Sequence, residues 1–389
     1  MSVIHERFFA MSKFPFKRCC LFAAVFAACA AASLLAEDAD VTPTIADGIT
    51  WYNAQDWPVE NKAWNDTARY FARLPGRAEG VVTDSVWNLS QKSAGELVRF
   101  RTDAPAIRLK FRLYGAQLAL PLMPATGYSG LDLYALDKND SDSGTWRWAA
   151  CTQPKSQEDN VELIGGMDPA MRDYMLYLPL YNGVDALEIG VPEGTEFHAV
   201  LPRTDRPILY YGTSITNGGC VSRPGNTFTA MLSRRLDIPV LNLGFAGSAR
   251  MEPELAELFA ELDPVLFVLD ALPNMDAKLI DQRGINFVQI LRDKHPDTPI
   301  LLVEDRVYSN SWIIHAKAER NRTSAEALRR VYDHFIAAGD KNIYYLGAEN
   351  LLGENVDNDS TMDSSHPNDL GMYRMTDSLE RAIRPILGM

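Results

Sequence analysis

Ser214 and the pair Asp363 and His366 have residue types and spacing that suit nucleophilic catalysis. Ser214 lies in the segment Gly212-Thr213-Ser214-Ile215-Thr216, which directly follows a short apolar run. This segment resembles a nucleophile elbow with Thr216 in place of its last glycine. Asp363 precedes His366 by three residues, so its carboxylate can orient the imidazole ring. Either pattern alone is more often an ordinary polar loop.

Two further loops contain groups that could bind a developing negative charge. Gly247 lies in Gly244-Phe245-Ala246-Gly247-Ser248, where glycine lets the backbone approach a ligand closely. Asn274 lies in Leu272-Pro273-Asn274-Met275 and has a neutral side-chain donor. A plain turn at Gly247 and a helix cap at Asn274 are the alternative interpretations.

These four loops each follow a predicted strand in a region of alternating strands and helices. The predicted strands are 208–211, 240–242, 265–269, 300–303 and 343–346, and the predicted helices are 228–236, 252–262, 278–294, 323–338 and 369–386. Strands that are apolar on both faces are typical of a parallel sheet covered by helices. The carboxyl ends of such strands share one edge, so we expect the loops to converge there.

The preceding region, from about 43 to 200, has the pattern of short strands. Apolar and charged residues alternate from Ile107 to Leu113, and Leu187 to Val191 repeat the pattern. Turn-rich breaks separate the runs, which favours a β-sandwich. The chain has 389 residues, more than one ordinary core contains, so we predict two domains, 43–204 and 205–389.

Residues 1–36 are predicted to be a signal peptide. Three basic residues precede an apolar run from Cys19 to Ala32, and small residues lead to Ala36 before an acidic start. A retained membrane anchor and a lipoprotein attached through Cys29 are the alternatives. We therefore expect export to the periplasm or out of the cell.

Charge and cysteine content exclude several classes of function. The net charge is −13, and it becomes about −16 without residues 1–36, which hold four basic residues and one acidic residue. Such a surface argues against nucleic acid and acidic lipid as partners. Only Cys151 and Cys220 remain, and whether they pair is left open. They are too few for a Cys-rich zinc site, and we expect no metal or other cofactor.

The order Ser, Gly, Asn and Asp-x-x-His, each after a strand, resembles the SGNH (GDSL-like) hydrolase family of esterases. The usual Gly-Asp-Ser block reads Gly212-Thr213-Ser214 here, and Leu272-Pro273-Asn274-Met275 replaces Gly-x-Asn-Asp. Both variants resemble the branch with a preceding β-domain and a Gly-x-Asp-Leu-Tyr signature. That branch is matched by Gly130-Leu131-Asp132-Leu133-Tyr134, Arg73-Leu74-Pro75, Val86-Trp87 and Leu178-Pro179-Leu180-Tyr181-Asn182-Gly183.

The resemblance covers roughly residues 50 to 389. It implies a jelly-roll-like β-sandwich followed by a flavodoxin-like, three-layer α/β/α hydrolase domain. It also implies that Ser214 is the nucleophile, that His366 is the general base and acid, and that Asp363 orients His366. The backbone N–H groups of Ser214 and Gly247 and the amide of Asn274 are then the oxyanion hole.

Weaker features concern the substrate. Arg223 in the loop after Ser214 and Glu304 after the fourth strand could contact substrate, or could be a solvated arginine and half of a structural ion pair. Trp146, Trp148 and Tyr128 could form a sugar platform or belong to the core.

Three hypotheses for the function follow. The first is an exported esterase that removes short acyl groups, chiefly O-acetyl, from polysaccharide. The second is a lipid-directed esterase, such as a lysophospholipase or short-chain lipase. The third is a glycan-binding protein without activity.

Overall fold

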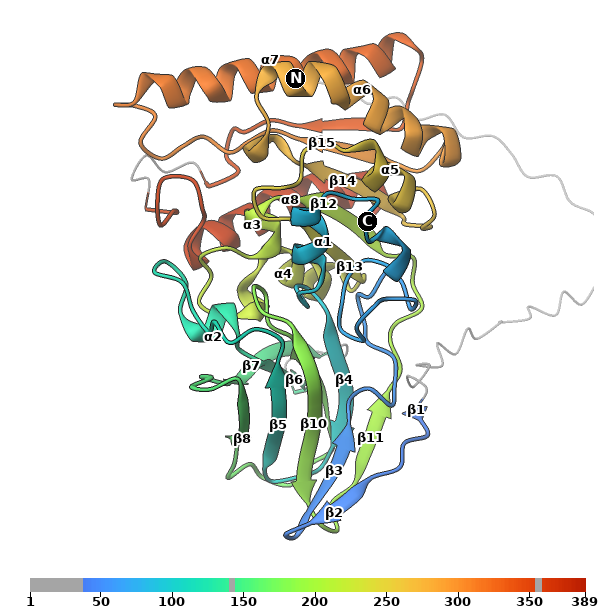
Figure 1. Ribbon diagram of the computed structural model, residues 1–389, viewed down its shortest axis with the longest axis vertical. Helices are drawn as coiled ribbons and strands as arrows, with labels where there is room; N and C mark the ends of the chain where they lie inside the picture. The colour runs from blue at the N-terminus through green and yellow to red at the C-terminus, as the bar shows by residue number, and fades with distance from the viewer. Residues whose placement is uncertain (1–37, 140–143, 354–358) are drawn as a thin grey trace, which may run out of the picture. The chain divides into compact units, whose positions relative to one another are not determined.

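The computed structural model describes residues 38–139, 144–353 and 359–389. Two antiparallel sheets precede a parallel sheet with helices on both faces, which confirms the predicted fold class (Figure 1). The predicted signal peptide and Cys29 lie outside the described residues, so export stays a prediction.

The antiparallel sheets form the predicted sandwich. One has the strand order β1-β11-β4-β9-β6-β7 and the other β2-β3-β10-β5-β8. In β5 the apolar residues of the alternating pattern are buried between the sheets. The strands are β1 (Asp38–Ala39), β2 (Thr44–Ala46), β3 (Ile49–Asn53), β4 (Leu97–Thr102), β5 (Ile107–Leu113), β6 (Asp132–Asp137), β7 (Thr145–Cys151), β8 (Glu158–Ile164), β9 (Arg172–Tyr177), β10 (Val184–Pro192) and β11 (Phe197–Val200).

The sandwich region also contains two short α-helices that the sequence does not predict. They are α1 (Asp84–Ser90), which Thr83 caps by accepting a hydrogen bond from the N–H of Val86 at 3.3 Å, and α2 (Ala125–Tyr128). Seven and four residues are too few to show a helical period of apolar residues.

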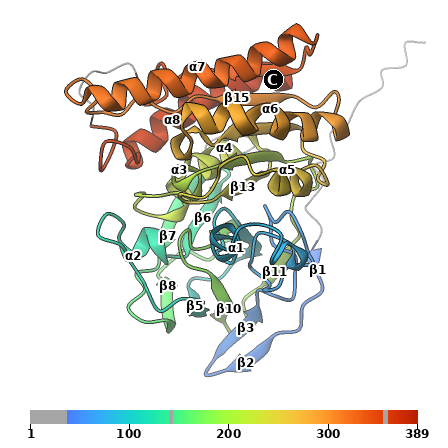
Figure 2. The ribbon, with the colours of Figure 1, turned by 45° about the horizontal axis from the view of Figure 1, so that its top comes forward.

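The parallel sheet has the order β13-β12-β14-β15-β16, the flavodoxin-like arrangement. Its strands are β12 (Ile208–Gly212), β13 (Val240–Gly244), β14 (Leu266–Asp270), β15 (Ile300–Val303) and β16 (Ile343–Leu346). Its helices are α3 (Ser214–Asn217), α4 (Phe228–Leu236), α5 (Pro253–Phe259), α6 (Ala277–Lys294), α7 (His315–Ala337) and α8 (Asp369–Leu387). Helices α5, α6 and α7 pack on one face of the sheet, and α4 and α8 on the other (Figure 2).

Helix α7 differs from its prediction because it begins at His315 instead of Thr323. Its first two turns contain no apolar residue larger than alanine, so they show no apolar period. Ion pairs between Arg322 and both Glu319 (2.6 Å) and Glu326 (2.5 Å) connect successive turns of this part of the helix. No described helix is long and apolar enough to cross a membrane.

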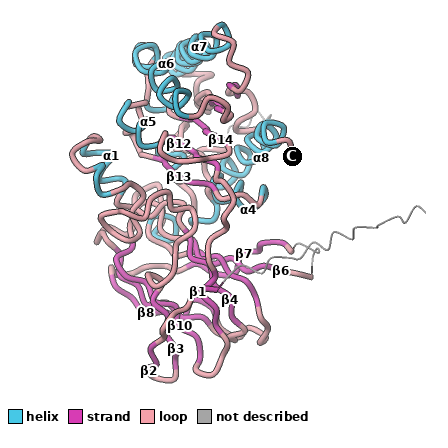
Figure 3. Tube along the Cα trace, turned by 90° about the vertical axis from the view of Figure 1, so that its right-hand side faces the viewer, coloured by secondary structure: helices cyan, strands magenta, loops and turns pink. Residues whose placement is uncertain are grey.

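The sandwich region and the parallel-sheet region pack against each other through apolar side chains. Leu74 and Val86 belong to the same buried cluster as Tyr211 and Phe245, and Tyr181 belongs to the cluster on the other face of the sheet. Residues Ala36–Met389 accordingly form one compact unit. Figure 3 shows the strands of both regions in magenta. The change from antiparallel to parallel strands falls between β11 and β12; the boundary at 204 and 205 stays a prediction.

Glu96 is a fully buried acid where these regions meet. Neither of its carboxylate oxygens has a hydrogen-bond partner among the described residues. Burial raises its pKa from 4.5 to about 7, against the opposing effect of the positive charges of Lys62 and Arg73. In the folded protein Glu96 is therefore mostly protonated below about pH 7.

This burial predicts a pH-dependent stability that Glu96→Gln removes. Below pH 4.5 Glu96 is protonated in both states, whereas above pH 7 the folded chain must bury a charge that water would hydrate in the unfolded chain. Relative to the variant, we expect the wild type to lose about 3 kcal/mol of unfolding free energy between pH 4.5 and pH 8, measured by urea denaturation.

Glu60→Gln is the matched control. Glu60 is also buried, but it accepts hydrogen bonds from Arg203 and Arg99, and these cations hold its pKa below the usual range despite burial. This substitution should destabilise the protein at neutral pH, with no gain relative to the wild type as the pH rises. If the unfolding free energies of wild type and Glu96→Gln changed in parallel with pH, the prediction would be contradicted.

Candidate active site

Ser214, His366 and Asp363 form a continuous chain of hydrogen bonds. Ser214 is the first residue of α3, which Thr213 separates from the end of β12, and its Oγ lies 2.7 Å from Nε2 of His366. Nδ1 of His366 lies 2.7 Å from Oδ2 of Asp363. Both distances suit proton transfer and orientation of the ring.

The Asp363 carboxylate is held by its own loop. The backbone N–H groups of His366 and Ser365 donate to its Oδ1 at 2.8 and 3.0 Å. Partial burial raises the pKa of Asp363, but the hydrogen bonds from the backbone and ring of His366 and from Ser365 outweigh it and bring the pKa below the usual value. Asp363 is therefore an anion that faces the imidazole ring.

Helix α3, which begins with Ser214, packs closely against the end of β13. A Cβ atom on Gly244 would lie 2.2 Å from the backbone nitrogen of Asn217, so only glycine allows this approach. Thr213 caps α3 and accepts a hydrogen bond from the N–H of Ile215 at 3.4 Å. As a first-turn residue, Ser214 has a backbone N–H with no partner inside the helix.

Gly247 and Asn274 meet at one loop beside Ser214. Gly247 has a φ of 70°, which favours glycine. The side-chain amide of Asn274 donates to the carbonyl of Phe245 in the same loop at 3.4 Å. The alternative that Asn274 caps the next helix is wrong, because Asp276 caps α6 by accepting from the N–H of Leu279 at 2.8 Å.

A cavity of about 580 Å³ brings all five predicted catalytic and oxyanion residues together. Its lining includes Ser214, Asp363, His366, Gly247 and Asn274. The sequence does not predict the remaining lining residues, which are Leu120, Pro121, Leu122, Met123, Tyr181, Gly219, Cys220 and Ala246. Four consecutive residues of the sandwich region, 120–123, therefore form an apolar wall of the cavity. They fall in a turn-rich break of the sequence, and no residue pattern marks them as part of a site.

Arg223 does not line this cavity, and its contact with substrate stays a prediction. It donates to the buried Oδ2 of Asp132 at 3.0 Å and to the hydroxyl of Tyr134 at 2.6 Å. The Gly-x-Asp-Leu-Tyr segment thus holds the loop after α3, and Oδ2 of Asp132 also accepts from the N–H of Gly225 at 2.8 Å.

Glu304 does not line the cavity either, and its partners are structural. It accepts a hydrogen bond from the hydroxyl of Tyr345 and another from the N–H of Ala348 at 2.8 Å. It therefore joins the loops after β15 and β16, and its contact with substrate stays a prediction.

The three aromatic residues do not form one platform. Tyr128 is buried and Trp146 is half-buried, whereas Trp148 is exposed and donates its ring N–H to Asp132 at 3.0 Å. Cys151 and Cys220 are both free.

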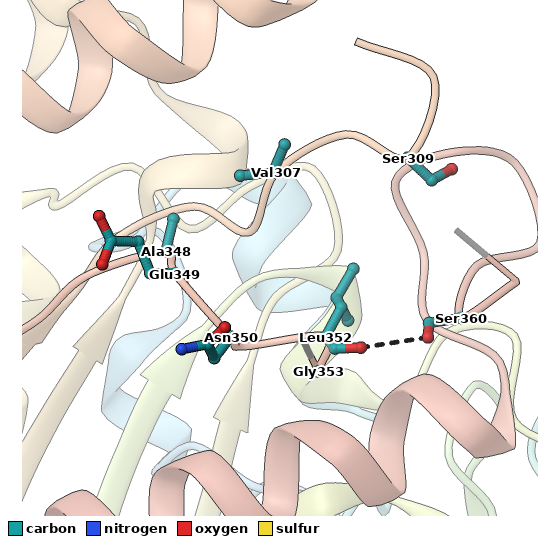
Figure 4. A pocket seen from close by; sticks show the side chains of 8 residues that line it. All are labelled: Val307, Ser309, Ala348, Glu349, Asn350, Leu352, Gly353 and Ser360. Atoms are coloured by element: carbon teal, nitrogen blue, oxygen red, sulfur yellow. Dashed lines mark hydrogen bonds between the residues drawn. The ribbon is translucent and has the colours of Figure 1, made fainter. Parts of the chain in front are cut away.

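A second cavity, of about 130 Å³, lies between the loops after β15 and β16 (Figure 4). Its lining includes Val307, Ser309 and Leu352, and the Ser360 hydroxyl donates to the Leu352 carbonyl at 3.2 Å. Neither Ser214 nor His366 lines it. Within the described ranges, no three His, Cys, Asp or Glu side chains are placed to hold a metal ion.

Comparison with known proteins establishes the family. A profile of the GDSL-like lipase/acylhydrolase family matches residues 205–384, and a profile for the N-terminus of SGNH-hydrolase-type esterases matches residues 49–197. The crystal structure of a protein from Bacteroides ovatus, described as a GDSL-like lipase, is 32% identical with a TM-score of 0.82, over 87% of this chain and 98% of that one. The chain belongs to the GDSL-like lipase/acylhydrolase family. This confirms the resemblance read from the sequence.

Other solved structures share the fold of this GDSL-like chain at lower identity. A salicylyl-acyltransferase from a tetracycline biosynthetic pathway is 17% identical with a TM-score of 0.63, over 90% of this chain and 93% of that one. A family two carbohydrate esterase from Cellvibrio japonicus is 13% identical with a TM-score of 0.55, over 87% of this chain and 98% of that one. No match was found among curated protein sequences.

Proposed function

We propose that the protein is a serine esterase that uses Ser214, His366 and Asp363 as a catalytic triad. The observation that carries this proposal is the hydrogen-bonded chain from Ser214 Oγ through His366 to Asp363, at 2.7 Å each, on the wall of a cavity. Ser214 attacks the ester carbonyl while His366 takes its proton. His366 then protonates the leaving alcohol, and water later releases the acyl group by the same path.

The oxyanion is bound by three hydrogen-bond donors, one on Ser214 and two on neighbouring loops. They are the backbone N–H groups of Ser214 and Gly247 and the side-chain amide of Asn274, all of which lie on residues that line the cavity. In the ground state the Asn274 amide has only a long hydrogen bond of 3.4 Å, so it can turn to a substrate oxyanion at little cost.

The proposed substrate is a short-chain ester, chiefly O-acetyl, on a carbohydrate such as a polysaccharide. Solved structures with the same fold include a family two carbohydrate esterase from Clostridium thermocellum in complex with cellohexaose, 13% identical with a TM-score of 0.52. The acidic net charge suits a neutral glycan better than a polyanion.

Export is proposed on the basis of residues 1–36. N-terminal sequencing of the protein from its native compartment should start near Glu37; an intact Met1 or Met11 would contradict cleavage.

Acetate release from acetylated polysaccharide tests the triad. The full mature chain should release acetate from acetylated xylan or xyloglucan, and Ser214→Ala should reduce release to background. Asn274→Ala should retain weak activity, lower by about 10²–10³-fold, because one of three oxyanion donors is lost. Wild-type release by Ser214→Ala would contradict the proposal. Absence of turnover even on aryl acetates, with glycan binding retained, would favour the non-catalytic alternative.

A second candidate is a lipid-directed esterase, and the apolar wall at 120–123 favours it. Leu120 and Leu122 expose about two-fifths of their surface, 38% and 42%, beside the cavity that contains Ser214. An apolar acyl chain that covered them would be stabilised by roughly 25 cal/mol per Å² of buried apolar surface.

A series of aryl esters from acetate to decanoate distinguishes the two candidates. The carbohydrate acetylesterase should have its highest kcat/KM on acetate, with little effect of Leu122→Ala. The lipid-directed enzyme should prefer eight or more carbons, and Leu122→Ala should then lower kcat/KM severalfold on long chains only. Ile336→Ala is the matched control, because Ile336 is 43% exposed and does not line the cavity.

A further inference from the structure

Arg73 is a buried arginine in the sandwich region whose side chain ends beneath the active-site loops. It is 3% exposed, and its five donated hydrogen bonds equal the number of N–H groups of a guanidinium. Nε donates to the Lys92 carbonyl at 2.9 Å and Nη2 to the Leu89 carbonyl at 2.8 Å, both in the segment at the end of α1. These two bonds attach the guanidinium group of Arg73 to the sandwich region.

The other bonds of Arg73 reach the helix that begins with Ser214 and the strand that precedes the Gly247 loop. Nη1 donates to the carbonyls of Asn242 and Gly244 at 3.1 and 2.7 Å, at the end of β13. Nη2 donates to Oδ1 of Asn217 at 3.2 Å, at the end of α3. One planar group thus joins the turn that begins with Ser214 to the strand that leads into the Gly247 loop.

The sandwich region contacts the Ser214 turn at two more points. The hydroxyl of Tyr181 donates to the carbonyl of Ser214 at 3.0 Å, and the side-chain amide of Asn217 donates to the carbonyl of Leu180 at 2.9 Å. The turn has only four residues, so it cannot fix its own position. These contacts from the sandwich region fix the position of α3, which so short a helix cannot fix by itself.

Lysine cannot replace Arg73 in this arrangement. Its single ammonium has three donors and no planar fork, so it cannot reach carbonyls on three segments at once. Burial lowers the pKa of Arg73 to about 10, with Glu96 opposing that effect, so the guanidinium remains charged at neutral pH.

We infer that Arg73 is a positioning residue for catalysis, which sets the distance between the nucleophile Ser214 and the oxyanion loop at Gly247. The inference rests on the proposed esterase function. It makes the sandwich region part of the catalytic framework, in addition to any role in binding a glycan. A displacement of about 1 Å between reacting groups can cost about 10²-fold in rate.

The test is Arg73→Lys in the full mature chain, with aryl acetate as substrate. We expect kcat to fall by about 10- to 100-fold while KM changes by less than about threefold, because the substrate cavity is retained and only the spacing of the reacting groups changes. The rate of inactivation by a fluorophosphonate, which needs the same nucleophile and oxyanion geometry, should fall in proportion.

Arg69→Lys is the matched control. Arg69 donates to the carbonyls of Gln91 and Val184 and to Asp185, all within the sandwich region. This variant should lower the thermal midpoint but keep kcat. If Arg73→Lys does not fold, Asn217→Ala removes the bond between α3 and Arg73, together with the bond to the Leu180 carbonyl, and should show the same loss confined to kcat.

Two results would overturn the inference. One is wild-type kcat and inactivation rate in a folded Arg73→Lys or, failing that, Asn217→Ala. The other is an equal loss of kcat in Arg69→Lys, which would indicate general loosening. Failure of the proposed function is distinguishable, because the wild type itself would then show no turnover and no fluorophosphonate inactivation.

Discussion

The nucleophile of this protein lies on a helix of four residues, and a helix that short is not stable by itself. The position of Ser214 therefore depends on its surroundings. The close approach of Gly244 to Asn217 is one of these constraints, because any side chain at Gly244 would overlap the backbone of α3. The hydrogen bonds from Tyr181 and Arg73 complete the frame, and both come from the sandwich region.

Segments that serve in the sequence only as marks of resemblance acquire a physical role in the structure. Arg73 donates hydrogen bonds to the ends of α3 and β13. Leu180 and Tyr181 form hydrogen bonds with the turn that begins with Ser214. Asp132 and Tyr134 bind Arg223 in the loop that follows that turn. These segments explain why the two regions form one compact unit.

The sequence predicts best what depends on local pattern. Strand β15 at Ile300–Val303 and helix α4 at Phe228–Leu236 agree with their predicted bounds. A strand buried on both faces is marked by a continuous apolar run, and an amphipathic helix by a clear period of apolar residues. The loops at the carboxyl ends of the parallel strands converge as the topology requires.

Contacts between distant parts of the chain escape such reasoning. Arg73 and Gly244 are 171 residues apart, and no periodicity links them. The wall at 120–123 lies in an irregular segment, and Arg223 is a loop arginine whose partners only the fold reveals.

The central claim, that Ser214 is the nucleophile, is tested most directly by peptide mass spectrometry after reaction of the full mature chain with a fluorophosphonate. The account predicts one adduct, on Ser214, that is lost in His366→Ala; a modified residue elsewhere, or esterase activity that persists without an adduct on Ser214, would contradict it.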